Sequence, residues 1–103
     1  MATIKIPGKS RKSIYVELVG TEYKVRPPKA SVAVFLAQAL QDAGEDAEKL
    51  MGALAKWNLV LFGKEVGPEV TQRLKSSTDD LDISDIVELI TAVMEESGGN
   101  PTT

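Results

Sequence analysis

Few residues of this chain could do chemistry, because it contains neither cysteine nor histidine. Without cysteine there are no disulfides, no thiolate nucleophile and no cysteine-ligated metal. Without histidine the commonest general base and the commonest metal ligand are missing. What remains is an acidic cluster with one serine at the start of a predicted helix: Asp79, Asp80, Asp82, Ser84 and Asp85. We therefore expect a protein that is not an enzyme, with no catalytic residue and no cofactor.

The acidic cluster is weak evidence for a metal site. Several carboxylate oxygens would suit a hard cation. The spacing, however, lacks the glycine at position six and the bidentate glutamate at position twelve of a calcium loop. Asp82 is a good N-cap, and further acidic residues in the first turn suit the helix dipole. Helix capping explains these residues, so we predict no metal ion.

Ser84 lies in a run that superficially resembles the acyl-carrier protein motif, in which a serine between aspartates carries a phosphopantetheine arm. Here the order is Asp-Ile-Ser-Asp, so the serine is displaced by one position. Only 19 residues follow Ser84, too few for the two further helices of that fold. We keep an acyl-carrier-like function only as a minor alternative.

A β-hairpin is predicted over residues 14–26. Residues 14–19 are rich in β-formers, and residues 22–26 alternate with a period of two. Gly20-Thr21 between them suits a two-residue turn, and Pro27-Pro28 should end the sheet, since neither residue can donate to a ladder. Ile4 and Ile6 could add a short strand before a basic loop.

Helical spacing of apolar residues follows the hairpin. We predict helices over about residues 32–43, 46–62 and 66–74, with Gly44 and Gly63 ending the first two. The last and clearest helix begins after Asp82, and its apolar stripe is expected to form core contacts: Ile83, Ile86, Val87, Ile90, Val93 and Met94. The predicted fold is mainly α, an N-terminal β-hairpin followed by about four amphipathic helices in a small bundle. It forms one domain, 1–97, with a flexible tail, 98–103.

Composition agrees with this fold. The chain has 103 residues, 43% hydrophobic and 26% charged, as is usual for a globular protein. Its net charge of -3 disfavours a strongly basic nucleic-acid binder. No apolar run approaches the roughly 20 residues that cross a bilayer, and residues 1–7 lack the apolar core of a secretion signal. We expect a cytosolic protein without a membrane partner.

The charge is unevenly distributed along the chain. Residues 1–29 have a net charge of +5, whereas residues 30–103 have a net charge of -8 and no basic residue after Lys75. Such polarity can direct head-to-tail self-association or attract a basic partner. The alternative is an acidic solvated helix beside an unrelated basic loop. Residues 57–62 are apolar on more than one face, so we expect a homo-oligomer and a partner-binding surface that contains Trp57, Leu59, Val60 and Phe62.

The order of elements and several local sequences resemble the tail assembly chaperones of long-tailed, siphovirus-like bacteriophages, in their short form. The matching features are a strand that runs into a basic and proline-bearing segment (22–28), a second helix that ends at Leu61-Phe62-Gly63, and a short Val-rich helix that ends at Leu74. The resemblance covers about residues 14–97. It implies no catalytic residue.

The resemblance implies a function in phage assembly. Such proteins bind the long, helical tape measure protein and keep it soluble until tail tube subunits polymerise around it. They act in the host cell cytoplasm and are absent from the mature virion. Many also exist in a longer, frameshifted form. An alternative from another class is a small regulatory or adaptor domain that binds nucleic acid or a protein partner through the basic N-terminal hairpin.

Overall fold

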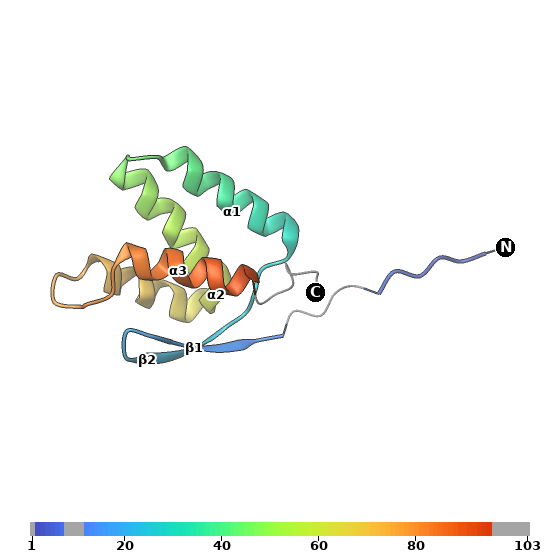
Figure 1. Cartoon of the computed structure of the whole chain (residues 1–103), viewed down its shortest axis with the longest axis horizontal. Coiled ribbons are helices and arrows are strands. Elements are labelled where there is room, and N and C mark those ends of the chain that lie inside the picture. The colour runs from blue at the N-terminus through green and yellow to red at the C-terminus, as the bar shows by residue number, and fades with distance from the viewer. Residues whose placement is uncertain (1, 8–11, 96–103) are drawn as a thin grey trace.

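The computed structural model describes residues 2–7 and 12–95. The chain is mainly helical with an N-terminal antiparallel hairpin, as predicted (Figure 1). Its elements are β1 (Ile14–Leu18), β2 (Thr21–Val25), α1 (Ala30–Ala43), α2 (Ala47–Lys75) and α3 (Ile83–Met94). The described part therefore has three helices, not about four. The predicted tail, 98–103, lies outside the described residues.

The difference in helix number arises at Gly63. The segments predicted as separate helices, 46–62 and 66–74, belong to one element, α2, which Gly63 interrupts with φ 94° and ψ 174°. Glycine adopts such a conformation without the steric cost of a Cβ atom. The helix resumes immediately, so that α2 consists of an N-terminal arm, 47–62, and a C-terminal arm, 64–75.

The two arms of α2 pack closely against each other. A Cβ atom on Gly67 would lie 2.9 Å from the carbonyl oxygen of Asn58 and 3.0 Å from the Cα atom of Leu59. The Asn58 side chain is buried and donates from Nδ2 to Thr71 Oγ1 at 2.9 Å. The bend at Gly63 is thus held by a backbone contact that only glycine permits at position 67.

The hairpin turn lies one residue earlier than predicted. Leu18 pairs with Thr21, so the turn is Val19-Gly20, with φ 47° and 87°, and not Gly20-Thr21. Two central residues with positive φ are typical of the turns that match the twist of the flanking strands. The Arg73 guanidinium donates to the carbonyl oxygens of both Leu18 and Val19, at 3.3 and 3.2 Å. This contact comes from α2, and no local pattern could reveal it.

The N-terminal segment, which we define as residues 2–7, is not a strand. Ile4 and Ile6 are 86% and 87% exposed, and the segment extends away from the rest of the protein (Figure 1). The predicted short strand is therefore wrong. Alternation alone does not make a strand, because the backbone also needs a neighbouring strand for its hydrogen bonds.

The core lies between the hairpin and the three helices. Its apolar side chains come from every element: Leu18, Val25, Leu36, Leu54, Trp57, Leu61, Phe62, Val70, Leu81, Ile86, Leu89, Ile90 and Val93. α1 ends at Gly44, and Asp46 caps α2, close to the predicted boundaries. Asp82 caps α3 as predicted: it accepts from the Ile83 N–H at 2.7 Å, while the Asp82 N–H donates to Asp85 at 2.9 Å.

The buried face of α3 is rotated from the predicted one. Ile86, Ile90 and Val93 are buried as expected, but Leu89 is buried as well, whereas Val87 is 42% exposed. The apolar stripe of α3 is wider than the core can cover. One side of it therefore remains open to solvent.

Candidate functional site

The three helices frame an open groove of about 430 Å³. Apolar side chains make up almost all of its surface, with Gln41 as the polar exception: Ala33, Ala37, Leu40, Gln41, Leu50, Trp57, Val87, Ile90 and Met94. Concave apolar surfaces of this size are typical of sites that bind ligands or partner side chains.

The shape of the groove follows from residue size along α1. Ala33 and Ala37 are one helical turn apart, on the same side of α1. Because both side chains end at Cβ, this side of α1 leaves an open space between α1 and the other helices that line the groove. Leu40 follows one turn later and lines the end of the groove.

Trp57 supplies the wall on α2. It is only 1% exposed, and its Nε1–H donates to the Leu36 carbonyl oxygen of α1 at 3.2 Å. A buried indole usually needs such an acceptor. This hydrogen bond between α1 and α2 fixes the orientation of the tryptophan ring in the wall. The opposite wall is the side of α3 that carries Val87, Ile90 and Met94.

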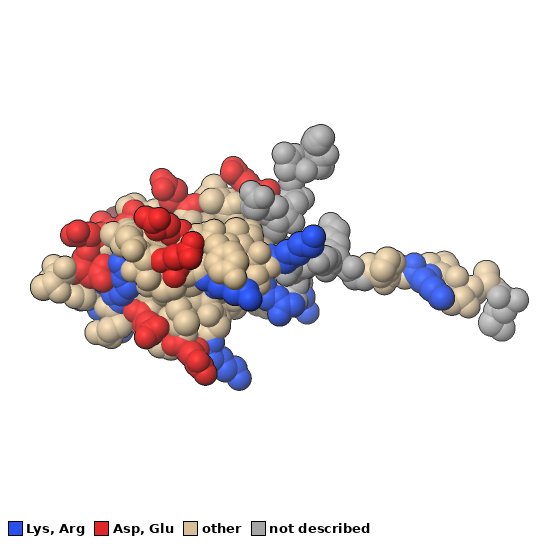
Figure 2. Space-filling view, turned by 90° about the horizontal axis from the view of Figure 1, so that it is seen from below, with Lys and Arg blue, Asp and Glu red and all other residues tan. Residues whose placement is uncertain are grey.

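Of the three helices that line the groove, α1 and α3 carry only acidic charged residues, whereas the N-terminal arm of α2 also contains Lys49 and Lys56. Asp42 is the only charged residue within α1, and Asp85 and Glu88 are the only ones within α3. Neither helix contains a lysine or an arginine. Figure 2 shows the molecule from the hairpin side, where acidic side chains gather away from the N-terminal segment and several basic side chains lie near its root. The groove therefore favours an apolar partner segment with basic residues beside it.

The four residues predicted to bind a partner do not form one surface. Trp57 and Phe62 are in the core, 1% and 8% exposed, and the Phe62 ring packs edge-on against Tyr23, with centroids 5.2 Å apart. Leu59 and Val60 are 45% and 37% exposed. Residues one or two positions apart on a helix face different directions, so an apolar run of six must divide between core and solvent. Only Leu59 and Val60 are available at the surface.

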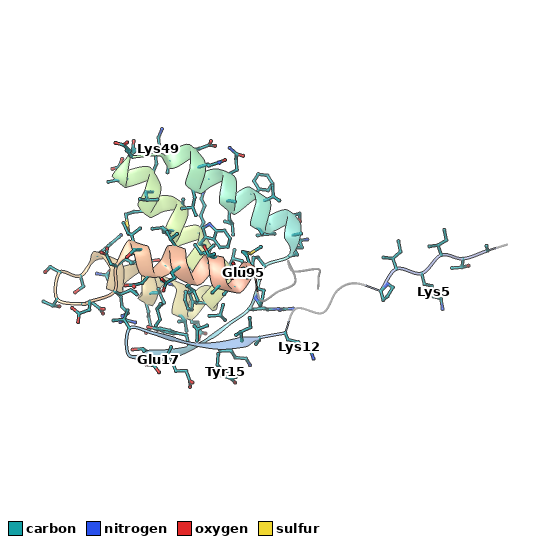
Figure 3. The ribbon with its side chains drawn as sticks, in the orientation of Figure 1. Lys5, Lys12, Tyr15, Glu17, Lys49 and Glu95 are labelled. Carbon is teal, nitrogen blue, oxygen red and sulfur yellow. The ribbon has the colours of Figure 1, made fainter. Side chains whose placement is uncertain are left out.

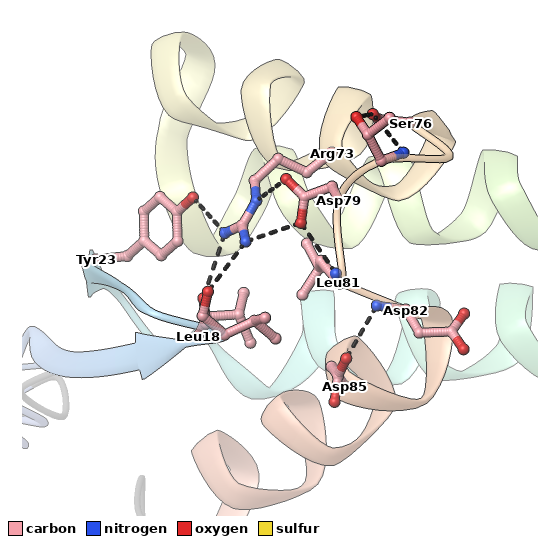
Figure 4. A network of polar contacts seen from close by, with 10 residues as sticks. Leu18, Tyr23, Arg73, Ser76, Asp79, Leu81, Asp82 and Asp85 are labelled. Atoms are coloured by element: carbon pink, nitrogen blue, oxygen red, sulfur yellow. Dashed lines mark hydrogen bonds and ion pairs between the residues drawn. The ribbon is translucent and has the colours of Figure 1, made fainter.

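A second feature is a polar network around Arg73 (Figure 4). The guanidinium binds the Asp79 carboxylate through two nitrogens, at 2.8 and 3.0 Å, and donates to the Tyr23 hydroxyl at 2.9 Å. The hydrogen bond from Arg73 and the backbone N–H of Leu81 both hold the pKa of Asp79 below its ordinary value of 3.8. The network connects the hairpin tip, the end of α2 and the loop before α3, and its function is structural.

The acidic cluster of the sequence is therefore used in folding. Asp79 pairs with Arg73, and Asp82 and Asp85 form the capping box of α3, while Asp80 is exposed. Among residues 2–7 and 12–95, no group of three or more possible ligands could hold a metal ion. No helix in the same ranges has the length and apolar character to span a membrane.

The hairpin surface has mixed charge. Tyr15 and Glu17 lie on the side of β1 that faces away from the helices (Figure 3). Glu17 lies directly opposite Glu22, and Tyr15 lies opposite Lys24. Two carboxylates are therefore adjacent on this face of the hairpin, beside the basic Lys24.

Sequence reasoning missed the groove because it assigned these residues to the core. The stripe of residues 83–94 predicts core contacts for Val87 and Met94 as well as for Ile90, but only Ile90 of the three is buried, and the pattern does not single out Ala33 and Ala37. The sequence feature that indicates the groove is the pair Ala33 and Ala37, two small residues at a spacing of four beside larger apolar residues. Small residues at that spacing can create a groove, but only when a third element leaves the space unfilled.

Comparisons with protein-family models, with curated proteins and with solved structures find no match to this chain.

Proposed function

We propose that the chain is a tail assembly chaperone of a long-tailed bacteriophage, which binds the helical tape measure protein and keeps it soluble during tail assembly. The observation that supports this most is the open apolar groove between α1, α2 and α3. A chaperone of this type needs no nucleophile, base or cofactor. It needs an apolar surface that covers a partner's apolar stripe, and enough charge to stay soluble.

Helix-in-groove docking is the simplest recognition mode for this surface. An amphipathic helix could insert apolar side chains between α1 and α3, while its basic residues meet the acidic sides of the groove. The protein would act in the host cytoplasm and be absent from the mature virion. The tail tube protein and a longer form of the chain are further candidate partners.

The experiment is co-production of the chain with the tape measure protein of the phage that encodes it, followed by measurement of the soluble and co-purified tape measure protein. Val87→Glu tests the groove, because Val87 lines it yet is 42% exposed, so a glutamate is tolerated in the free protein. Val60→Glu is the matched control: it is 37% exposed and lies outside the groove. We expect Val87→Glu to reduce binding by about tenfold or more, since a buried carboxylate must be desolvated.

A second groove variant tests binding in the groove without introducing a charge. Ala37→Gln fills the groove at an exposed lining position without adding a charge, and it should weaken binding in the same way. If Val60→Glu abolishes binding and the two groove variants do not, the partner binds at Leu59 and Val60. If the unmodified chain neither binds nor solubilises the tape measure protein, the proposed function is wrong.

The nucleic-acid alternative predicts a different result. A domain that binds duplex DNA through the basic hairpin would do so with a steep salt dependence, because phosphate contacts release counterions. Filter binding at low salt measures this directly. The mixed charge around Glu17 and Glu22 leads us to expect no such binding.

A further inference from the structure

Two apolar features of the described chain are open to solvent and differ in shape: the concave groove, and the extended N-terminal segment with Ile4 and Ile6. These two isoleucines have the highest exposed fractions among the large hydrophobic residues described, 86% and 87%. We propose that the N-terminal segment of one copy binds in the groove of a second copy, with both isoleucines inserted between α1 and α3.

The dimensions of the two features match. In an extended chain Ile4 and Ile6 point to the same side and are about 7 Å apart. Along α1 the groove runs from Ala33 to Gln41, eight residues, which is about 12 Å at the helical rise of 1.5 Å per residue. Two isoleucine side chains therefore fit along the groove, and the alanines of α1 provide the room for them.

The charges are also complementary. Lys5 lies between the two isoleucines, so its side chain points to the opposite side of the extended segment and stays at the mouth of the groove, and Lys9, Arg11 and Lys12 follow in the sequence. In the part of the chain that the structure describes, Lys5 makes no ion pair, because the pair between Arg73 and Asp79 is the only one there. Of the three helices that line the groove, α1 and α3 contain acidic and no basic residues, whereas the N-terminal arm of α2 contains Lys49 and Lys56. Figure 3 shows Lys5 far out on the segment and Glu95 at the end of α3.

The arrangement of the elements favours a second copy as the source of the segment. In Figure 1, α3 lies between α1 and the hairpin, and the segment leaves from the hairpin side and points away from the helices. A contact between the segment of one copy and the groove of another is heterologous, because it joins two different surfaces. It therefore produces a dimer with reciprocally exchanged segments, a larger ring or an open chain of subunits.

This contact uses the same groove as the proposed binding of the tape measure protein, but it requires no tape measure protein. A bound segment would cover the apolar groove of a free chaperone and would compete with a helical partner. Self-association can be measured with this chain alone, so the contact and the proposed function can fail separately.

The first measurement is sedimentation velocity over a wide range of protein concentrations. The segment variant is the double substitution Ile4→Ser and Ile6→Ser, and the groove variant is Val87→Glu. None of these positions is buried, so the variants should fold. Tyr15→Ser is the matched control, a 65% exposed hydrophobic residue on the hairpin. We expect the unmodified chain and the control to associate, and the dissociation constants of both test variants to rise at least about tenfold.

The decisive step is to mix the two test variants. The segment variant keeps an intact groove, and the groove variant keeps an intact segment, so the mixture should contain a heterodimer that neither variant forms alone. A contact between two grooves or between two segments, or a segment bound in the groove of its own chain, predicts no such species. Absence of the heterodimer, an unchanged dissociation constant in either variant, or an unmodified chain that stays monomeric would overturn the proposal.

Trp57 provides an independent signal, because it is the only tryptophan and lines the groove. A synthetic peptide with residues 2–12 contains no tryptophan or tyrosine and is therefore silent. Added to the segment variant, it should shift the Trp57 emission in a saturable way, and the same peptide with both isoleucines replaced by serine should not. Equal responses to the two peptides would contradict docking of Ile4 and Ile6.

Discussion

Substitutions at two glycines of α2 can test how closely the two arms of this helix pack against each other. Gly67 of the C-terminal arm lies against the backbone of the N-terminal arm, with the position of an added Cβ only 2.9 Å from the Asn58 carbonyl oxygen. Gly52 is also helical, but an added Cβ there meets nothing within 4 Å. The substitutions Gly67→Ala and Gly52→Ala are therefore the same chemical change in the same helix, with and without a steric conflict.

The expected effects have opposite signs. Replacing glycine by alanine in a helix stabilises a protein by about 1 kcal/mol, because the unfolded chain loses conformational freedom. At Gly52 this gain should appear undiminished. At Gly67 the clash is with backbone atoms, which cannot rotate away, and such overpacking costs about 1–3 kcal/mol. We expect Gly67→Ala to be less stable than Gly52→Ala by about 1–3 kcal/mol, and this difference measures the steric cost alone.

Urea unfolding followed by circular dichroism tests this prediction. With a slope of about 1–3 kcal/mol per molar urea, a difference of about 2 kcal/mol separates the two midpoints by about 1 M. If the free energy of unfolding falls with urea concentration at the same slope in both variants, the two variants unfold from equally compact states. If the two midpoints coincide, or if Gly67→Ala has the higher one, the arms of α2 do not approach each other closely at Gly67.

Three further outcomes follow from the same structure. Val19→Asn should raise the free energy of unfolding by about 1 kcal/mol, because asparagine tolerates the positive φ that a β-branched residue resists; an unchanged urea midpoint would contradict this strain. Ile86→Ala should cost about 2–5 kcal/mol and Val87→Ala much less, since the two side chains are 0% and 42% exposed; equal urea midpoints would show that α3 is rotated differently. Arg73 lowers the pKa of Asp79. The contribution of this carboxylate to the free energy of unfolding is therefore complete above its ordinary pKa of 3.8 and is lost as pH falls through the lowered pKa. Asp79→Asn should thus be less stable than the unmodified chain at pH 7, with a smaller difference at pH 2, as urea midpoints at both pH values would show.

Local features of the fold follow from the sequence alone. The hairpin, the end of α1 at Gly44 and the beginning of α3 after Asp82 were all predictable, because each depends on residues within one or two helical turns or one strand pair. Hydrophobic periodicity identifies an element, and capping residues identify its ends. The absence of cysteine and histidine likewise narrows the range of chemistry open to the chain, since this depends on composition and not on folding.

Which side chains of these elements form long-range contacts, and which stay exposed, depends instead on tertiary packing. Arg73 of α2 contacts the hairpin tip, where the turn is Val19-Gly20, and contact between Gly67 and Asn58 holds the two arms of α2 together. Val87 belongs to the same apolar stripe as Ile86, yet it lines an open groove, because no element of the described chain covers that side of α3. A periodic pattern shows that a helix has an apolar face, but the extent to which that face is buried depends on the elements that pack against it.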